Sequence, residues 1–102
     1  MAAASPEELD TLLEDALLMG DGPAAAALFA GADAVVAAAG CLRRGAQAVE
    51  LLTACGYLAS PHCVRVGHRV ALAIGDRALA VSAQGADGRW RLLTVVLLSA
   101  SV

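Results

Sequence analysis

Residues 63–98, CVRVGHRVALAIGDRALAVSAQGADGRWRLLTVVLL, decide the fold class of this chain. Runs rich in valine, leucine and alanine are separated there by Gly75-Asp76 and by the segment 85–88, which contains glycine and aspartate. Glycine and aspartate between apolar runs are typical of tight turns that join neighbouring antiparallel strands. The pattern therefore predicts an antiparallel meander of three strands, over residues 63–74, 77–83 and 89–98.

The last of these strands is apolar on both faces. Strict alternation would place Trp90, Leu92, Thr94 and Val96 on one face and Leu93, Val95 and Leu97 on the other. An antiparallel sheet with one face in water would carry polar residues on that face. We therefore expect one face to pack on helices and the other on a second copy of the same sheet.

The N-terminal half of the chain predicts two helices. Ser5-Pro6-Glu7-Glu8 is typical of a helix start, because serine caps, proline fits the first position and Glu8 completes a capping box. Leucines and alanines follow at spacings of three and four as far as Leu17, and acids, Asp10 among them, hold much of the other face. Residues 19–23 end this helix, and Pro23–Phe29 predicts a second, shorter one.

The middle of the chain predicts a short hairpin and a third helix. Short strands are expected over Ala34–Ala38 and Cys41–Arg43, with a turn at Gly40 between them. Gly45–Cys55 predicts the helix, because Gly56 follows as a natural stop. The predicted fold class is α+β, as one domain over residues 1–102, in the order α-α-β-β-α-β-β-β.

Composition excludes several classes of protein. The net charge is −3, and the arginines form no basic stripe of the kind that binds nucleic acid. No apolar run reaches the roughly 18 residues that a membrane-spanning helix needs. The first residues carry no basic side chain, so they do not resemble a secretory signal, and a cytoplasmic protein is expected.

The cysteines and histidines do not indicate a metal site or a disulfide framework. Cys41, Cys55 and Cys63 are odd in number and have no CxxC spacing, which favours reduced thiols. His62 and Cys63 are neighbours, so in a strand they would face opposite sides. No glycine-rich phosphate motif is present either, and we expect neither a metal nor a cofactor.

Four local segments, in the same order along the chain, resemble the SnoaL-like family of the nuclear transport factor 2-like superfamily. They are Leu17–Phe29, where Gly-Asp precedes an alanine-rich run ending in Leu-Phe; Phe29–Val35, FAGADAV; Arg44–Val49, RGAQAV; and Asp87–Arg91, DGRWR. The resemblance implies a cone-shaped, cystatin-like fold in which three helices pack on a strongly curved antiparallel sheet around an apolar cavity. It also implies homodimers that form through the sheet.

The resemblance also implies where a site would lie. Enzymes of this superfamily, such as ketosteroid isomerase and the polyketide cyclases, place an acid or base on the first strand, but residues 35–39 here are VVAAA. Asp76 and Asp87 occupy predicted turns. Tyr57, after the third helix, and His68, inside the predicted strand 63–74, remain as catalytic candidates. The implied ligand pocket is lined by Tyr57, His68, Trp90, Val36 and Ala38.

Three functions stay open. The favoured one is a non-catalytic, homodimeric SnoaL-like protein that binds a small apolar molecule or a protein partner, because the first strand lacks an acid. The alternative is an isomerase, cyclase or hydrolase that acts on a polyketide-like or steroid-like molecule. A further alternative is a stand-alone regulatory module related to the C-terminal domains of sigma factors. Neither a nucleic acid nor a membrane is an expected partner.

Overall fold

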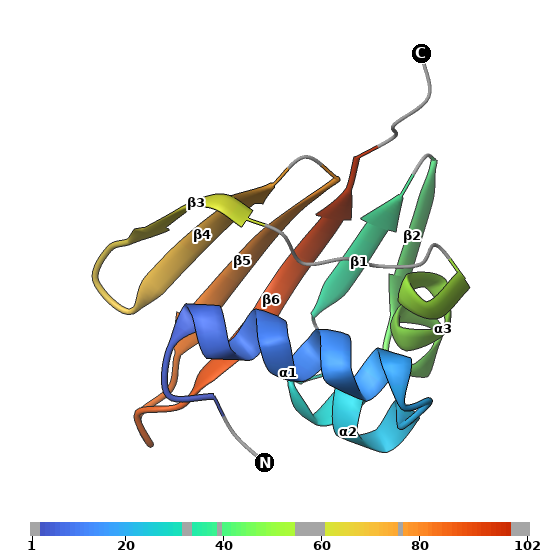
Figure 1. Cartoon of the computed structure of the whole chain (residues 1–102), viewed down its shortest axis with the longest axis horizontal. Coiled ribbons are helices and arrows are strands. Elements are labelled where there is room, and N and C mark those ends of the chain that lie inside the picture. Colours follow the sequence, from blue (N-terminus) through green and yellow to red (C-terminus); the bar gives the residue numbers. More distant parts are fainter. Residues whose placement is uncertain (1–2, 32–33, 39, 55–60, 76, 99–102) are drawn as a thin grey trace.

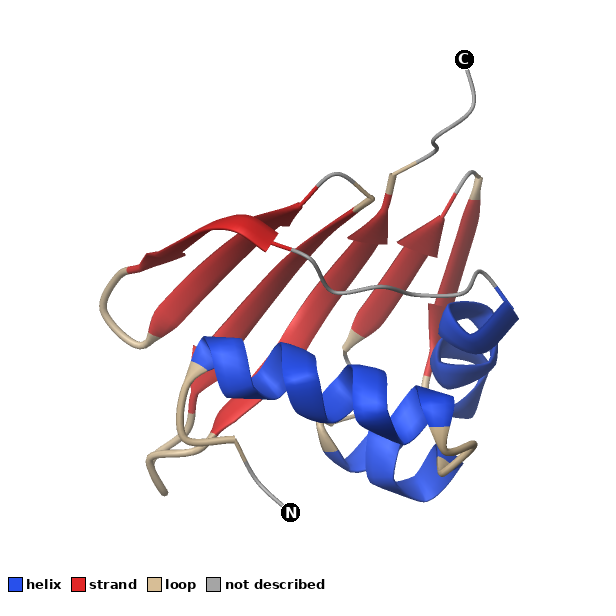
Figure 2. Ribbon diagram, in the orientation of Figure 1, coloured by secondary structure: helices blue, strands red, loops and turns tan. Residues whose placement is uncertain are grey.

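A curved six-stranded sheet and three helices make up the computed structural model, which describes residues 3–31, 34–38, 40–54, 61–75 and 77–98. Helix α1 crosses in front of the sheet near one end of its strands, and α3 lies beside the sheet edge formed by β2 (Figures 1 and 2). The elements are α1 (Pro6–Leu18), α2 (Gly22–Ala27), β1 (Val35–Ala38), β2 (Cys41–Arg44), α3 (Ala46–Ala54), β3 (Pro61–Val66), β4 (Val70–Gly75), β5 (Ala78–Gln84) and β6 (Trp90–Leu97).

The strands lie in the order β2-β1-β6-β5-β4-β3. β1 pairs in parallel with β6, and the other neighbouring pairs are antiparallel. Leu9, Leu13 and Leu52 from the helices share one buried core with Val36 and Val95 from the centre of the sheet. The predicted α+β class, with three helices on a mostly antiparallel sheet, is therefore confirmed. None of the described helices is long and apolar enough to cross a membrane.

Helix α1 begins and ends at the residues that its sequence indicates. Ser5 Oγ accepts a hydrogen bond from the Glu8 backbone N–H at 3.1 Å, which confirms the predicted cap. At the other end Gly20 adopts a φ of 69°, in the left-handed region that glycine tolerates best. The N–H of Asp21 can then donate to the Ala16 carbonyl at 2.9 Å, which closes a Schellman motif.

Helix α2 is shorter than predicted and leads directly into the sheet. Asp21 Oδ1 accepts from the Ala24 N–H at 3.1 Å and so caps the helix, which ends at Ala27 rather than at Phe29. The Leu92 N–H donates to the Leu28 carbonyl, and the Ala30 N–H donates to the Leu92 carbonyl, both at 2.8 Å. These bonds explain why the helix stops early, because residues 28–30 run as a short parallel extension beside β6.

The predicted long strand over residues 63–74 is wrong: it is two strands, β3 and β4, joined by a turn. The Gly67 N–H donates to the Val70 carbonyl at 2.8 Å across this turn. Arg69 supplies a φ of 60°, the left-handed conformation that usually belongs to glycine or asparagine. An arginine gives no sequence signal for such a turn, so the meander has one strand more than the predicted order.

The predicted faces of β6 are also wrong beyond Leu92. Ser82 pairs with Leu92 and Val81 pairs with Thr94, so Leu93 is an extra residue that forms a β-bulge. A bulge reverses the alternation of the residues that follow it. Val95 therefore lies on the same buried, helix-covered side as Leu92. Thr94 turns to the opposite side.

The sheet face turned away from the helices, here called the outer face, is mostly apolar. The pairing places Leu42, Ala37, Val96, Leu79, Ile74 and Cys63 in one row across it. The next row runs Arg44, Val35, Thr94, Val81, Leu72 and Arg65. An apolar centre is thus bordered by an arginine on each edge strand.

Candidate functional site

Four of the five residues predicted to line a pocket fall within the described residues, and these four do not line a common cleft. Val36 is fully buried on the helix-covered side of β1, and Ala38 is half-buried at the end of that strand. Trp90 is buried at the opposite end of the sheet, where its backbone N–H donates to the Ala3 carbonyl at 3.0 Å. His68 is exposed in the β3–β4 turn and not inside a strand as predicted. Tyr57 lies outside the described residues.

A buried carboxyl on α1 is the ionisable group that sequence reasoning missed. Asp10 is only 6% exposed and shares the buried face of α1 with Leu9 and Leu13. Burial, and to a smaller extent the negative charges of Glu7 and Glu14, together raise the pKa of this carboxyl to about 6. Among the residues that the structure describes, no cation forms a salt bridge with it.

The spacing of α1 contained a signal for this burial. Asp10 stands three residues before Leu13 and seven before Leu17, so it falls inside the apolar stripe of the helix. Asp10 also stands three residues after Glu7 and four before Glu14. This spacing groups it with the acids that are predicted to lie on the other face of the helix. The structure places it with the stripe.

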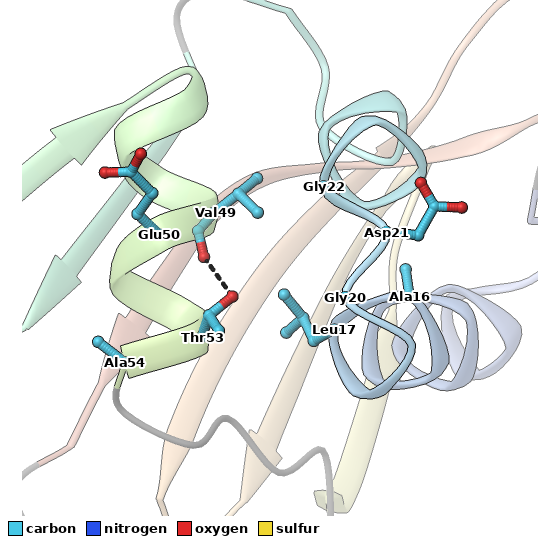
Figure 3. Close-up of a pocket in the computed structure, with 9 residues that line it drawn as sticks. All are labelled: Ala16, Leu17, Gly20, Asp21, Gly22, Val49, Glu50, Thr53 and Ala54. Atoms are coloured by element: carbon cyan, nitrogen blue, oxygen red, sulfur yellow. Dashed lines mark hydrogen bonds between the residues drawn. The ribbon is translucent and has the colours of Figure 1, made fainter.

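A cleft of about 390 Å³ lies between α1 and α3, and we call it the α1–α3 cleft (Figure 3). Leu17 of α1 and Val49 of α3 point toward one another across it. Ala16 and Ala54 extend the apolar wall on either side. The Thr53 hydroxyl, at the end of α3, donates to the Val49 carbonyl at 2.9 Å.

The polar groups of this cleft stand at its border. Asp21 and Glu50 lie on opposite sides of it, and both side chains point outward in Figure 3. No histidine, cysteine or basic residue is among its described lining residues. The arrangement can hold an apolar molecule, and it offers no pair of groups suited to nucleophilic attack. A second cleft of about 290 Å³ lies on the other side of α1, against α2.

The described residues do not gather a metal-binding cluster. No group of three or more histidine, cysteine, aspartate or glutamate side chains comes together within the described ranges. Cys41 is exposed on β2 and Cys63 is half-buried on β3, both as free thiols. The predicted absence of a metal stays a prediction.

Comparison with known proteins rests on structure. No family model matches the sequence, and no curated protein matches it. A ketosteroid isomerase-like protein from Erwinia carotovora atroseptica superposes with a TM-score of 0.71 at 15% identity, over 94% of each chain. A Nostoc punctiforme protein of unknown function with a cystatin-like fold gives a TM-score of 0.70 at 13% identity, over 94% of this chain and 90% of that one.

A third structure supports the same assignment. An NTF-2-like protein of unknown function from Shewanella oneidensis superposes with a TM-score of 0.65 at 12% identity, over 87% of this chain and 92% of that one. These identities are too low to carry function, since one fold hosts many activities. The chain therefore has the cystatin-like α+β fold of the nuclear transport factor 2-like proteins, as its ordered motifs predicted.

Proposed function

We propose that this protein is a non-catalytic binding domain that holds a small, mainly apolar molecule in the α1–α3 cleft. The observation that carries the proposal is the cleft itself. Its volume of about 390 Å³ falls within the range of roughly 300–1,000 Å³ that is usual for small-molecule sites. Its walls, formed by Ala16, Leu17, Val49 and Ala54, are apolar.

The first strand supports binding rather than catalysis. Proton abstraction needs a carboxylate or imidazole within hydrogen-bond reach of the substrate. The structurally similar Erwinia protein is named for ketosteroid isomerase. In this chain β1 consists of valine and alanine, so that strand supplies no acid or base.

The binding proposal is tested by closing the cleft. Native mass spectrometry of the purified protein, followed by methyl NMR of Leu17 and Val49 with added apolar molecules, reports binding at this place. Ala54→Phe adds bulk at the exposed end of α3 and should abolish the methyl shifts. Ala86→Phe adds the same bulk in the exposed β5–β6 turn and should leave them unchanged. Equal binding by the wild type and Ala54→Phe would contradict the proposal.

The same proposal includes a homodimer in which the outer faces of two sheets pack together. The outer face is apolar in its centre and has arginines on its edge strands, which is the composition of a protein interface with a polar rim. Leu42 on β2 and Val70 on β4 remain 56% and 46% exposed in the single chain. A second copy of the face would cover these side chains.

A second candidate function rests on Asp10. A buried carboxyl whose pKa is raised to about 6 is suited to exchanging protons near neutral pH. An isomerase of this kind would use the carboxyl to move a proton from the α-carbon of a β,γ-unsaturated ketone to its γ-carbon, giving the conjugated enone. Its substrate would have to reach Asp10, which lines neither of the two clefts described above. Ultraviolet absorbance of the enone follows this reaction. Turnover by the wild type and its loss in Asp10→Asn would support the enzyme, and no turnover by the wild type would reject it.

A further inference from the structure

The charges of this chain are divided between its helices and its sheet. All seven arginines lie on strands or in the turns between them: Arg43, Arg44, Arg65, Arg69, Arg77, Arg89 and Arg91. Seven of the ten acids lie on the helices or cap one: Glu7, Glu8, Asp10, Glu14, Asp15, Asp21 and Glu50. The helical segments therefore carry no cation. A cleft between such segments concentrates a negative potential.

Two helix ends add to this potential at the α1–α3 cleft. Leu17 lies in the last turn of α1, and Thr53 and Ala54 end α3. The C-terminal end of a helix carries roughly half a negative charge, which basic residues often neutralise. Neither α1 nor α3 has a basic residue in its last turn.

One element opposes this effect. The N-terminal end of α2, which is positive, also borders the cleft at Gly22. The carboxylate of Asp21 caps that end by accepting from the Ala24 N–H, so a full negative charge lies beside the partial positive one. Because Glu50 lies across the cleft, the net electrostatic potential around the opening stays negative.

The side chains of the cleft can accept hydrogen bonds but cannot donate them. The Thr53 hydroxyl uses its proton on the Val49 carbonyl. Asp21 and Glu50 are carboxylates, which only accept when ionised. A ligand with a positive charge is attracted by these acceptors while its apolar part contacts Leu17 and Val49.

We propose that the α1–α3 cleft selects small molecules that combine a compact apolar body with a positively charged ammonium group. The inference rests on the binding function proposed above and names the class of ligand. The apolar body lies between Leu17 and Val49. The ammonium group lies at the opening, near the C-terminal ends of α1 and α3, and Asp21 and Glu50 on the border attract it through space.

Three probes of one shape and different charge test this selectivity. Adamantylamine, which is a cation at neutral pH, is compared with neutral adamantanol and anionic adamantane carboxylate. Affinities come from calorimetry, and methyl NMR of Leu17 and Val49 reports the place of binding. We expect the amine to bind about tenfold more tightly than the alcohol, and the carboxylate to bind least. The advantage of the amine should shrink in high salt, because exposed charges are screened.

Matched variants locate the charges that matter. Glu50→Gln should lower the affinity for adamantylamine about threefold and leave adamantanol unchanged. Glu7→Gln removes the same charge in the first turn of α1, outside the cleft, and should change neither.

The outcomes separate this inference from the function on which it rests. Equal affinities for the three probes, or the same loss in Glu50→Gln and Glu7→Gln, would overturn the charge selectivity and leave apolar binding intact. If none of the probes shifts the methyl signals of Leu17 and Val49, the binding function is rejected and the selectivity with it.

Discussion

The two faces of strands β4 and β5 differ in the size of their side chains. The helix-covered face, here called the inner face, carries small residues on these strands: Ala71, Ala73, Ala80 and Ser82, all of them buried. The outer face of the same strands carries Leu72, Ile74, Leu79 and Val81. The larger apolar side chains thus point away from the helices of their own chain. A protein that worked as a monomer would expose them to water at a cost in solubility.

The difference indicates two kinds of packing. The alanines of the inner face belong to the same buried core as the leucines of α1, and the bulky residues of the outer face are available to another molecule. Because the two faces alternate along each strand, a shift of one residue exchanges them. The predictions below test that division, from the largest expected effect to the smallest.

Deleting Leu93 and Thr94 together would exchange the faces of the residues that follow in β6. Val95 would then lie opposite Val81 on the outer face, and Val96 would lie opposite Ala80 in the core. We expect a loss of more than about 3 kcal/mol in the free energy of unfolding, measured by urea titration with circular dichroism. Deleting Leu93 alone removes only the bulge, keeps Thr94 opposite Val81 and Val95 opposite Ala80, and should cost less than about 1 kcal/mol. Similar stabilities of the two variants would show that the register of β6 does not set the faces.

Leu79→Glu introduces a charge at the centre of the outer face. An unpaired carboxylate between two packed sheets is strongly unfavourable, so the proposed dimer should weaken by roughly 100-fold or more while the monomer stays folded. Analytical ultracentrifugation measures the change in mass with concentration. Ala86→Glu, in the exposed β5–β6 turn, should leave the dimer intact. A wild-type protein that sediments as a monomer would reject the dimer outright.

Ala80→Leu tests the close packing of the inner face. Ala80 is 5% exposed and pairs with Val95 in the centre of the sheet, where a larger side chain has no room. Overpacking of this kind costs about 1–3 kcal/mol of unfolding free energy. Ala83→Leu makes the same change on the outer face of β5 and should cost less than about 0.5 kcal/mol. Equal costs would show that the inner face is loosely packed.

Asp10→Asn tests the ionisable group on the helix-covered side. Its pKa is about 6 in the folded protein against 3.8 for an unperturbed aspartate, so the native state holds a proton more tightly. The protonated carboxyl of Asp10 therefore adds to the free energy of unfolding. This contribution is complete below about pH 4 and is lost as the pH rises through about 6. The wild type should therefore gain stability relative to Asp10→Asn as the pH falls.

Thermal melts between pH 4 and pH 8 measure this difference. At pH 8 the variant should be the more stable by about 1 kcal/mol, because the amide needs less desolvation than a carboxylate. The effect has the opposite sign to the loss expected when an acid stabilised by a salt bridge is removed. Parallel pH profiles of the two proteins would show that the carboxyl of Asp10 is solvated.

Local signals made most of the fold predictable. The cap at Ser5 and the turns at Gly40 and residues 85–88 depend on residues close together in the sequence, and they were read correctly. The turn at Arg69 was missed because a left-handed arginine has no local signature. The bulge at Leu93 was missed because it depends on the register of β6 against β5.

The candidate site was less predictable than the fold. The α1–α3 cleft exists because residues 16–22 and residues 49–54 lie close together in the fold. No motif in either segment predicts that contact. The predicted exposure of Asp10 is wrong for a different reason. Its position in the apolar stripe of the helix predicts burial, whereas its acidic neighbours in the sequence predict exposure to solvent.

The position of β6 has a consequence for how the protein is made. β6 is the last strand in the sequence, yet it lies between β1 and β5 and also binds residues 28–30. During synthesis two parts of the sheet are made before β6. The first is the β1–β2 hairpin with the helices, and the second is the β3–β5 meander. The two parts cannot join into one sheet until β6 leaves the ribosome. Such long-range pairing slows folding. Both halves must therefore keep their apolar surfaces from aggregating until β6 has left the ribosome.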